Sequence, residues 1–267
     1  MKLFKNFFFI IFLYIIINHG LAHSTLLSYQ SEYKITLGQN NDPRIPGQTY
    51  VDEASGYLLI DWINNCEESW VTTQRMMTKF INSNGVGTVS EINYSLNEQT
   101  DGKKMDFVLE VKENAELVDR HYGKAEKDKD VTVKFMKKDK LLKFSNDIIF
   151  PHKFLEDVIK NLKSEKKMIV RNVYEGTIPD KFFNISVFFT DEEVSVDSEL
   201  LGKGIINNFR KIRMAYYQDE SQTPIFEQNV HLNKQGIASF FRYDYPEYSL
   251  ELSLKKVQLT PIDCENR

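Results

Sequence analysis

Hydrophobic and polar residues alternate with a period of two along most of this chain. In segments 105–111, 131–135 and 250–254, apolar side chains occupy every second position. Because successive side chains of a strand point to opposite faces of a sheet, this pattern predicts strands with one buried face. We expect the large residues on these faces to be buried, namely Phe107, Leu109, Phe188, Leu250 and Leu252. Further strands are predicted at 32–37, 56–62, 71–81, 89–96, 116–125, 168–174, 182–190, 212–217, 225–232 and 237–245.

The sequences between these strands favour an antiparallel sheet. Asn- and Gly-containing turns occur at 82–85 and 233–236, and such turns are typical of hairpins and meanders. No regular alternation of strands and helices suggests a parallel α/β sheet. The Lys/Asp run 124–130 is predicted to be a solvated hairpin turn, and the acidic stretch 191–199, with Gly202-Lys203-Gly204 after it, a connector. The fold class is therefore mainly β.

One segment has the period of a helix. Its apolar residues are Phe154, Leu155, Val158, Ile159 and Leu162. Charged residues occupy the opposite side, and a proline at 151 suits a first helical turn. The sequence predicts one amphipathic helix at about 151–163, packed on the sheet, and few other helices.

The first residues have the layout of a secretory signal peptide. Lys2 and Lys5 precede an apolar run at 7–17, and small residues lead to a cleavage site after Ala22. The alternative is an uncleaved anchor, but the run is shorter than the ~20 residues that span a bilayer. We expect a signal peptide at 1–22, a single domain at 23–267, and a soluble exported chain, since no later segment has spanning length.

Composition and charge exclude some partners. The chain is 13% aromatic and 42% hydrophobic, which is typical of a globular protein. Removal of residues 1–22 takes away two lysines and no acid, so the net charge changes from −4 to −6. A mildly acidic chain with interspersed charges offers no electrostatic surface for nucleic acid or for an anionic membrane.

Cys66 and Cys264 are the two cysteines of the chain. In an exported protein such a pair predicts one structural disulfide. Two free thiols would suit a cytosolic protein, which the signal peptide argues against. A redox-active pair usually has close spacing, whereas these residues lie almost 200 positions apart.

Catalytic motifs are missing from the sequence. It contains no Walker A loop, no G-x-S-x-G and no H-E-x-x-H. The histidines of the exported chain are isolated: His23, His121, His152 and His231. The adjacent carboxylates at 67–68 and 191–193 are expected in solvated turns, because neighbouring residues of a strand point to opposite faces. We predict no enzymatic activity, no metal and no cofactor.

Aromatic residues occur in adjacent pairs in the second half of the chain, at 182–183, 188–189, 216–217 and 240–245. Adjacent residues of a strand project to both faces of the sheet. One interpretation is a sheet whose inner face is filled by the helix and by its own curl. The other is an apolar groove inside a curved sheet, suited to an acyl chain or a peptide.

An ordered set of short motifs resembles a known family. In chain order these are Tyr33-x-Ile35-x-Leu37, Gly56-Tyr57, Cys66 with Trp70 and Gln74-Arg75, Phe150-Pro151, Val173-Tyr174-Glu175-Gly176-Thr177, Leu232 to Ile237, Tyr243-Asp244-Tyr245 and Cys264. Over about residues 24–264 the chain resembles the cell-envelope-integrity protein B (EipB) family of Gram-negative bacteria. Residues 67–69, where the family tends to have a glycine, and the stretch 191–199 depart from its pattern.

The resemblance implies a monomeric periplasmic β-spiral: one long, strongly curved antiparallel sheet, similar to the half-barrel of periplasmic lipoprotein carriers, with the Cys66–Cys264 disulfide. It implies a non-catalytic role in envelope integrity and a periplasmic tetratricopeptide-repeat protein as partner. Three functions follow as hypotheses: binding of a protein partner, carriage of lipid or lipoprotein acyl chains in an apolar groove, and an enzyme acting on envelope glycans. The sequence does not identify the residues that would bind a ligand.

Overall fold

The computed structural model describes residues 26–39, 48–66, 68–136, 141–162, 164–218 and 221–261. The predicted signal peptide and Cys264 lie outside the described residues, so cleavage and the disulfide pairing stay predictions. Within the described ranges, no helix has both the length and the apolarity needed to cross a membrane.

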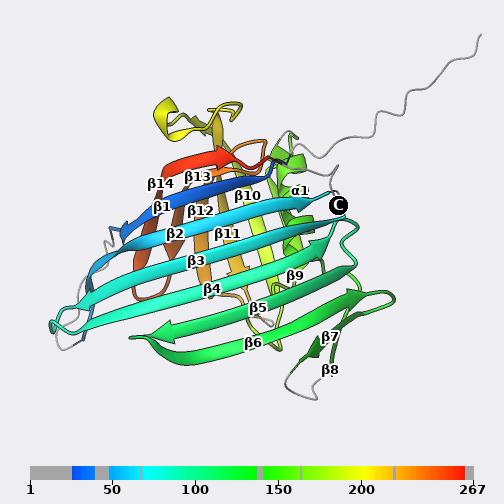
Figure 1. The fold of residues 1–267 in the computed structure, drawn as a ribbon, viewed down its shortest axis with the longest axis horizontal. Coiled ribbons are helices and arrows are strands. Elements are labelled where there is room, and N and C mark those ends of the chain that lie inside the picture. Colours follow the sequence, from blue (N-terminus) through cyan, green and yellow to red (C-terminus); the bar gives the residue numbers. More distant parts are fainter. Residues whose placement is uncertain are drawn as a thin grey trace, which may run out of the picture.

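The described residues form one antiparallel sheet of fourteen strands (Figure 1). The strands are β1 (Tyr29–Leu37), β2 (Val51–Asn65), β3 (Ser69–Asn82), β4 (Gly87–Gln99), β5 (Lys104–Glu113), β6 (Glu116–Lys127), β7 (Val131–Phe135), β8 (Leu141–Phe144), β9 (Met168–Val173), β10 (Phe183–Val194), β11 (Phe209–Tyr217), β12 (Phe226–Leu232), β13 (Ala238–Asp244) and β14 (Ser249–Leu259). The one α-helix of the described part is α1 (Pro151–Leu162), and a short 3-10 helix lies at Ser198–Leu200. The predicted mainly β class and the amphipathic helix are confirmed.

The order of the strands explains how the ends of the chain meet. It runs β8-β7-β6-β5-β4-β3-β2-β1-β14-β13-β12-β11-β10-β9. Two meanders, β1–β8 and β9–β14, therefore join where β1 pairs with β14, and α1 connects the two outer edges, β8 and β9. Because these two edges do not pair, the sheet curls without closing into a barrel.

The curl places the two meanders face to face. In Figure 1, β1–β6 run across the front of the molecule, β10–β13 pass behind them, and α1 lies between the two layers at one end. The apolar stripe of α1, including Phe154, Val158 and Ile159, is buried in the same core as residues of both meanders. The helix therefore buries its apolar stripe against the sheet, as its amphipathic pattern predicts.

Side chains of β4 and β6 hold the open side of the spiral, in place of strand pairing. We call them the seam residues: Tyr94, Glu98, His121 and Lys127. Each bonds main-chain atoms between Ile148, just before α1, and the loop after β9. His121 Nε2 donates to Gly176 O at 2.7 Å, and Lys127 Nζ donates to Ile148 O at 2.9 Å. Because most buried main-chain groups need a partner, these bonds satisfy the carbonyl groups of Gly176 and Ile148, which lie outside the strands.

Glu98 takes the place of a helix N-cap. The carboxylate of Glu98 is fully buried and accepts hydrogen bonds from His152 N at 2.6 Å and Lys153 N at 3.1 Å, at the first turn of α1. Phe150, which precedes the helix, has no side-chain acceptor, so a carboxylate from a distant strand satisfies the free N–H groups. This bond fixes the helix to the opposite meander.

Two local predictions were wrong. Phe188 is 41% exposed, whereas its neighbour Phe189 is 4% exposed. Ile185 and Val187 are also buried, so the inward phase of β10 passes through Phe189. The acidic stretch is not wholly a connector, since β10 continues to Val194.

Basic residues lie opposite the acidic end of β10. Lys167 Nζ lies 2.6 Å from an Asp191 oxygen, and Lys211 Nζ lies 2.6 Å from a Glu192 oxygen. These cross-strand pairs neutralise the charges that suggested a loop. The predicted turn at 124–130 is shorter than expected, because β6 extends to Lys127.

Candidate ligand cavity

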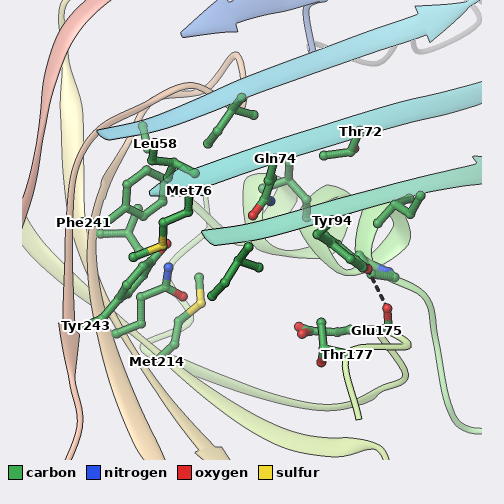
Figure 2. A pocket seen from close by; sticks show the side chains of 18 of the residues that line it. Leu58, Thr72, Gln74, Met76, Tyr94, Glu175, Thr177, Met214, Phe241 and Tyr243 are labelled. Atoms are coloured by element: carbon green, nitrogen blue, oxygen red, sulfur yellow. Dashed lines mark hydrogen bonds between the residues drawn. The ribbon is translucent and has the colours of Figure 1, made fainter. Parts of the chain in front are cut away.

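The two meanders enclose a cavity of about 490 Å³ on the concave side of the sheet (Figure 2). Strands β2 to β5 form one wall, β10 to β13 form the other, and α1 lies at one end. Most of the lining is apolar or aromatic; it includes Leu58, Ile60, Met76, Leu109, Phe154, Phe183, Met214, Phe226, Val230, Phe241 and Tyr243. The groove interpretation is therefore favoured, since helix and sheet do not fill the concave face.

The lining residues differ in their exposure. Lining residues near α1, such as Trp62, Leu96 and Phe154, are buried. At the opposite end Ile92 is half-buried and Tyr245 is 36% exposed. The cavity is therefore accessible from the surface along part of its lining.

The inward face of β3 carries polar side chains where alternation alone would place apolar ones. Thr72 and Gln74 line the cavity on this strand, as Figure 2 shows. Thr72 is 1% exposed, and its Oγ1 has no hydrogen-bond partner among the described residues. Trp62, directly opposite Thr72 in the sheet, presents an Nε1 that is likewise unpartnered there. A buried polar atom without a partner is costly, so these two groups lower the stability of this part of the sheet.

A carboxylate enters the cavity from the loop after β9. Tyr94 Oη donates a hydrogen bond to the main-chain oxygen of Glu175 at 2.5 Å, and the Glu175 side chain extends into the cavity (Figure 2). Burial raises the pKa of the Glu175 carboxyl to about 7. Desolvation is the physical cause, because a charge surrounded by apolar groups loses its water.

The local backbone makes this placement specific. Gly176 has φ 74°, in the left-handed region that favours glycine, and a side chain there would lie 2.5 Å from the ring of Phe107. His121 bonds the carbonyl of the same glycine. The loop is thus held on both sides of Glu175 by residues of the opposite meander.

Tyrosines and a glutamine form a polar patch on the other wall. Tyr216 Oη donates to Gln228 Oε1 at 2.9 Å, and Tyr243 lies opposite Gln228 in the register of β12 and β13. Burial raises the pKa of both Tyr216 and Tyr243 well above the ordinary value of a tyrosine. These groups are therefore neutral hydrogen-bonding partners at physiological pH.

The structure does not bring the predicted histidines together. His121 belongs to the seam, and His152 stacks on Trp70 with ring centroids 4.7 Å apart. The Nε2 atom of His152 lies 3.2 Å from a Glu156 oxygen. His231 lies on β12 beside Phe240, and His23 is outside the described residues. Within the described ranges, no group of three His, Cys, Asp or Glu side chains is placed to hold a metal ion.

The other candidates take ordinary positions. Glu68 follows Glu67, which lies outside the described residues, and Asp191 and Glu192 form the surface ion pairs described above. Gly202-Lys203-Gly204 lies between the 3-10 helix and β11. The inner members of the aromatic pairs, Phe183, Tyr216 and Phe241, line the cavity, and their neighbours do not.

Sequence reasoning missed Glu175, Thr72, Gln74 and Gln228 as cavity residues. Glu175 stands in one of the motifs that carry the family resemblance, but nothing in its neighbourhood predicts an inward carboxylate. Thr72, Gln74 and Gln228 are polar residues at inward positions of their strands. The sequence would reveal them as cavity residues only if the phase of each strand were already known.

The carboxyls of Glu98 and Glu175 predict how stability depends on pH. Burial raises the pKa of Glu98 to about 8 and that of Glu175 to about 7, against about 4.3 in an unfolded chain. Between these values the folded state binds more protons than the unfolded state, so stability falls as pH rises. Burial lowers the pKa of His152 and His231, which has the opposite effect, but only below about 6.5.

We therefore expect the free energy of unfolding to decrease from pH 6.5 to pH 8, by at most about 1.4 kcal/mol per carboxyl for each pH unit. The slope should be smaller in Glu175→Gln and unchanged in Glu53→Gln, whose side chain is exposed on β2. Urea unfolding at four pH values measures this directly. A slope of the opposite sign in this range would contradict the prediction.

Comparisons with known proteins agree with this architecture. The model of the EipB-like family matches residues 21–261. Cell envelope integrity protein EipB of Brucella abortus (strain 2308) is 21% identical over 241 residues, which cover 88% of this chain and 84% of that protein. The crystal structure of a β-barrel-like protein of domain of unknown function DUF1849 from Brucella abortus superposes with a TM-score of 0.80 at 22% identity, over 88% of this chain and 99% of that one. That structure shares the fold, and the family resemblance seen in the sequence is confirmed. The chain belongs to the EipB-like family.

Proposed function

We propose that this protein supports the integrity of the cell envelope from the periplasm, without catalysis, by holding one small apolar or amphipathic molecule in its cavity. The observation that carries the proposal is the unfilled concave face. A cavity of about 490 Å³ with a mainly apolar lining and a few polar groups has the size and character of small-molecule sites, which span about 300–1,000 Å³.

The envelope role and the location are supported by relatedness. A relative over most of the chain is named as a cell envelope integrity protein, and the first 22 residues have the pattern of a signal peptide. We expect native protein in the periplasmic fraction, beginning at His23 and monomeric. Terminal sequencing that begins at Met1 in a membrane fraction would contradict this.

The cavity favours binding over glycan hydrolysis. Enzymes that cleave glycosidic bonds usually use two carboxyl groups on either side of the bond. Among the residues that line the cavity, Glu175 is the one with a carboxyl group. A single carboxylate in an apolar space suits recognition of a ligand.

The test is to fill the cavity. Met214 lines the inner wall on β11, so Met214→Trp should obstruct the space. The matched control is Val170→Trp, on β9, where the side chain is 40% exposed. We expect N-phenyl-1-naphthylamine, a neutral apolar fluorophore, to bind the unmodified protein and the control, and to bind Met214→Trp at least tenfold more weakly. Equal binding to all three, or no binding to any, would contradict the proposal.

A protein partner is the second candidate, favoured by the free edge of the sheet. β8 has one strand neighbour, β7, among the described residues, and Leu141 at its start is 59% exposed. An exposed edge strand can accept a strand from another protein. Titration calorimetry with a purified periplasmic tetratricopeptide-repeat protein tests this, with Leu142→Pro as the variant that should weaken pairing. Heat of binding that is absent, or that the proline leaves unchanged, would count against this edge.

A further inference from the structure

Among the described residues that line the cavity, Glu175 is the one with a formal charge. The residues that line the cavity include no lysine, arginine or histidine, and no other acid. Among the described residues no side chain donates a hydrogen bond to the Glu175 carboxylate, and none forms an ion pair with it. The carboxylate therefore lies in an apolar space with no partner from the described part of its own chain.

The molecule holds this carboxylate in place at several points. The main-chain oxygen of Glu175 accepts from Tyr94, the next carbonyl accepts from His121, and the left-handed Gly176 packs on Phe107. These contacts come from β4, β5 and β6, so they are independent of the strand that precedes the loop. The Glu175 residue is half-buried, and a partly desolvated carboxylate without a partner costs stability; such groups are enriched at functional sites.

The groups around Glu175 are neutral at physiological pH. Those near enough to interact with it electrostatically are Tyr94 on β4, Tyr216 on β11 and Tyr243 on β13. All three hydroxyls are already engaged, Tyr94 with the main chain, and Tyr216 and Tyr243 with Gln228. Their rings present electron-rich faces, which attract cations. The lining thus offers one negative charge and several aromatic faces, and no positive charge.

We infer that the cavity selects an amphipathic ligand whose head is a protonated amine, which pairs with the Glu175 carboxylate while the apolar tail extends along the cavity. This inference rests on the proposed function and specifies its ligand class. It disfavours fatty acids and other anionic amphiphiles, because an anionic head would meet a carboxylate and no cation. A neutral head such as an alcohol can enter, but it gains no ion pair.

The experiment compares three probes with the same chain length: dodecylamine, 1-dodecanol and dodecanoate, each below its micelle concentration. Binding is followed at pH 8 by the fluorescence of the tryptophans, since Trp62 lines the cavity. Dodecylamine is protonated at this pH, as a lysine side chain is. We expect it to bind about ten- to a hundredfold more tightly than dodecanol, as for a charge-assisted hydrogen bond in place of a neutral one, and dodecanoate to bind most weakly.

Glu175→Gln keeps the shape of the side chain and removes its charge. In this variant we expect dodecylamine and dodecanol to bind with similar affinity, and dodecanol to bind as it does to the unmodified protein. That second result shows that the cavity is still formed. Glu53→Gln, at an exposed position of β2, should keep the preference for the amine. At pH 5.5 the unmodified protein should lose most of that preference, since its carboxylate would then be protonated.

The outcomes separate this inference from the proposed function. If dodecanol binds but the amine has no advantage, or keeps its advantage in Glu175→Gln, the inference about the head group is wrong and the cavity remains a binding site. Tighter binding of dodecanoate would contradict the inference in the same way. If none of the three probes binds, both the inference and the proposed function are wrong.

Discussion

Replacing Cys66 or Cys264 with serine is expected to lower the free energy of unfolding by up to about 5 kcal/mol, the value of the chain-entropy model for so long a loop. This is comparable to the whole stability of many domains. The single variants should melt at lower temperature and be degraded faster by proteases, and the double variant should be no less stable than either single one. Thermal melts with and without a reducing agent measure the effect.

The described residues place the segments that lead to Cys66 and Cys264 on the two sides of Ser28. Ser28, just before β1, accepts a hydrogen bond from Asn64 N on its Oγ at 2.8 Å, and its main-chain oxygen accepts one from Thr260 N at 2.9 Å. The end of β2 therefore lies on one side of Ser28, and the end of β14 on the other. The ends of β2 and β14 are two strand spacings of about 4.8 Å apart, and a disulfide needs Cα atoms within about 7 Å, so the predicted bond requires the chain to converge beyond the ends of both strands.

Free-thiol titration of the unreduced, denatured protein checks the pairing itself. We expect no reactive thiol. Two reactive thiols per chain would contradict the prediction, whatever the melting temperatures are.

Truncation of Phe107 is the second large effect that we expect. Phe107→Ala should cost about 3–5 kcal/mol, as for other buried aromatic residues. Its ring packs against Tyr174 and Phe135, with centroid distances of 5.8 Å in each case, and against the loop at Gly176. The lost volume would therefore affect both meanders, and with them the loop that positions Glu175.

The matched control is Phe188→Ala. Because Phe188 is exposed on the outer face of β10, its loss should change the free energy of unfolding by no more than about 0.5 kcal/mol. Leu109, Leu250 and Leu252 should behave like Phe107, at about 2–5 kcal/mol each for truncation to alanine. Chemical denaturation measures the series, and similar small effects at all five positions would show that the strand phases are wrong.

The error at Phe188 shows what local sequence can decide. Period-two alternation identified the strand, but at a Phe-Phe pair the period alone does not say which member is buried. The flanking Ile185 and Val187 have the same phase as Phe189, and they resolve the choice. At the acidic end of β10 the basic partners, Lys167 just before β9 and Lys211 on β11, are distant in sequence, so no local pattern could have shown that the strand continues.

β8 was missed for a similar reason. Leu141–Phe144 is four residues long, and so short a segment carries too few alternations to distinguish a strand from a connector. The segment forms a strand through its antiparallel pairing with β7. The helix, by contrast, repeats its apolar stripe over three turns, and the sequence located it within one residue of its observed end.

The sequence by itself determined the elements, because alternation, helical period and turn residues are local properties of the chain. It also carried enough ordered motifs to indicate the family. Only the tertiary structure decided that the concave face holds a cavity, and that Glu175 points into it. The reason is physical: the cavity exists because β4 and β6 hold the loop after β9 through Tyr94 and His121, contacts between residues 81 and 55 positions apart. The burial that changes the acidity of Glu175 arises from these same distant contacts, and no segment of the chain contains it.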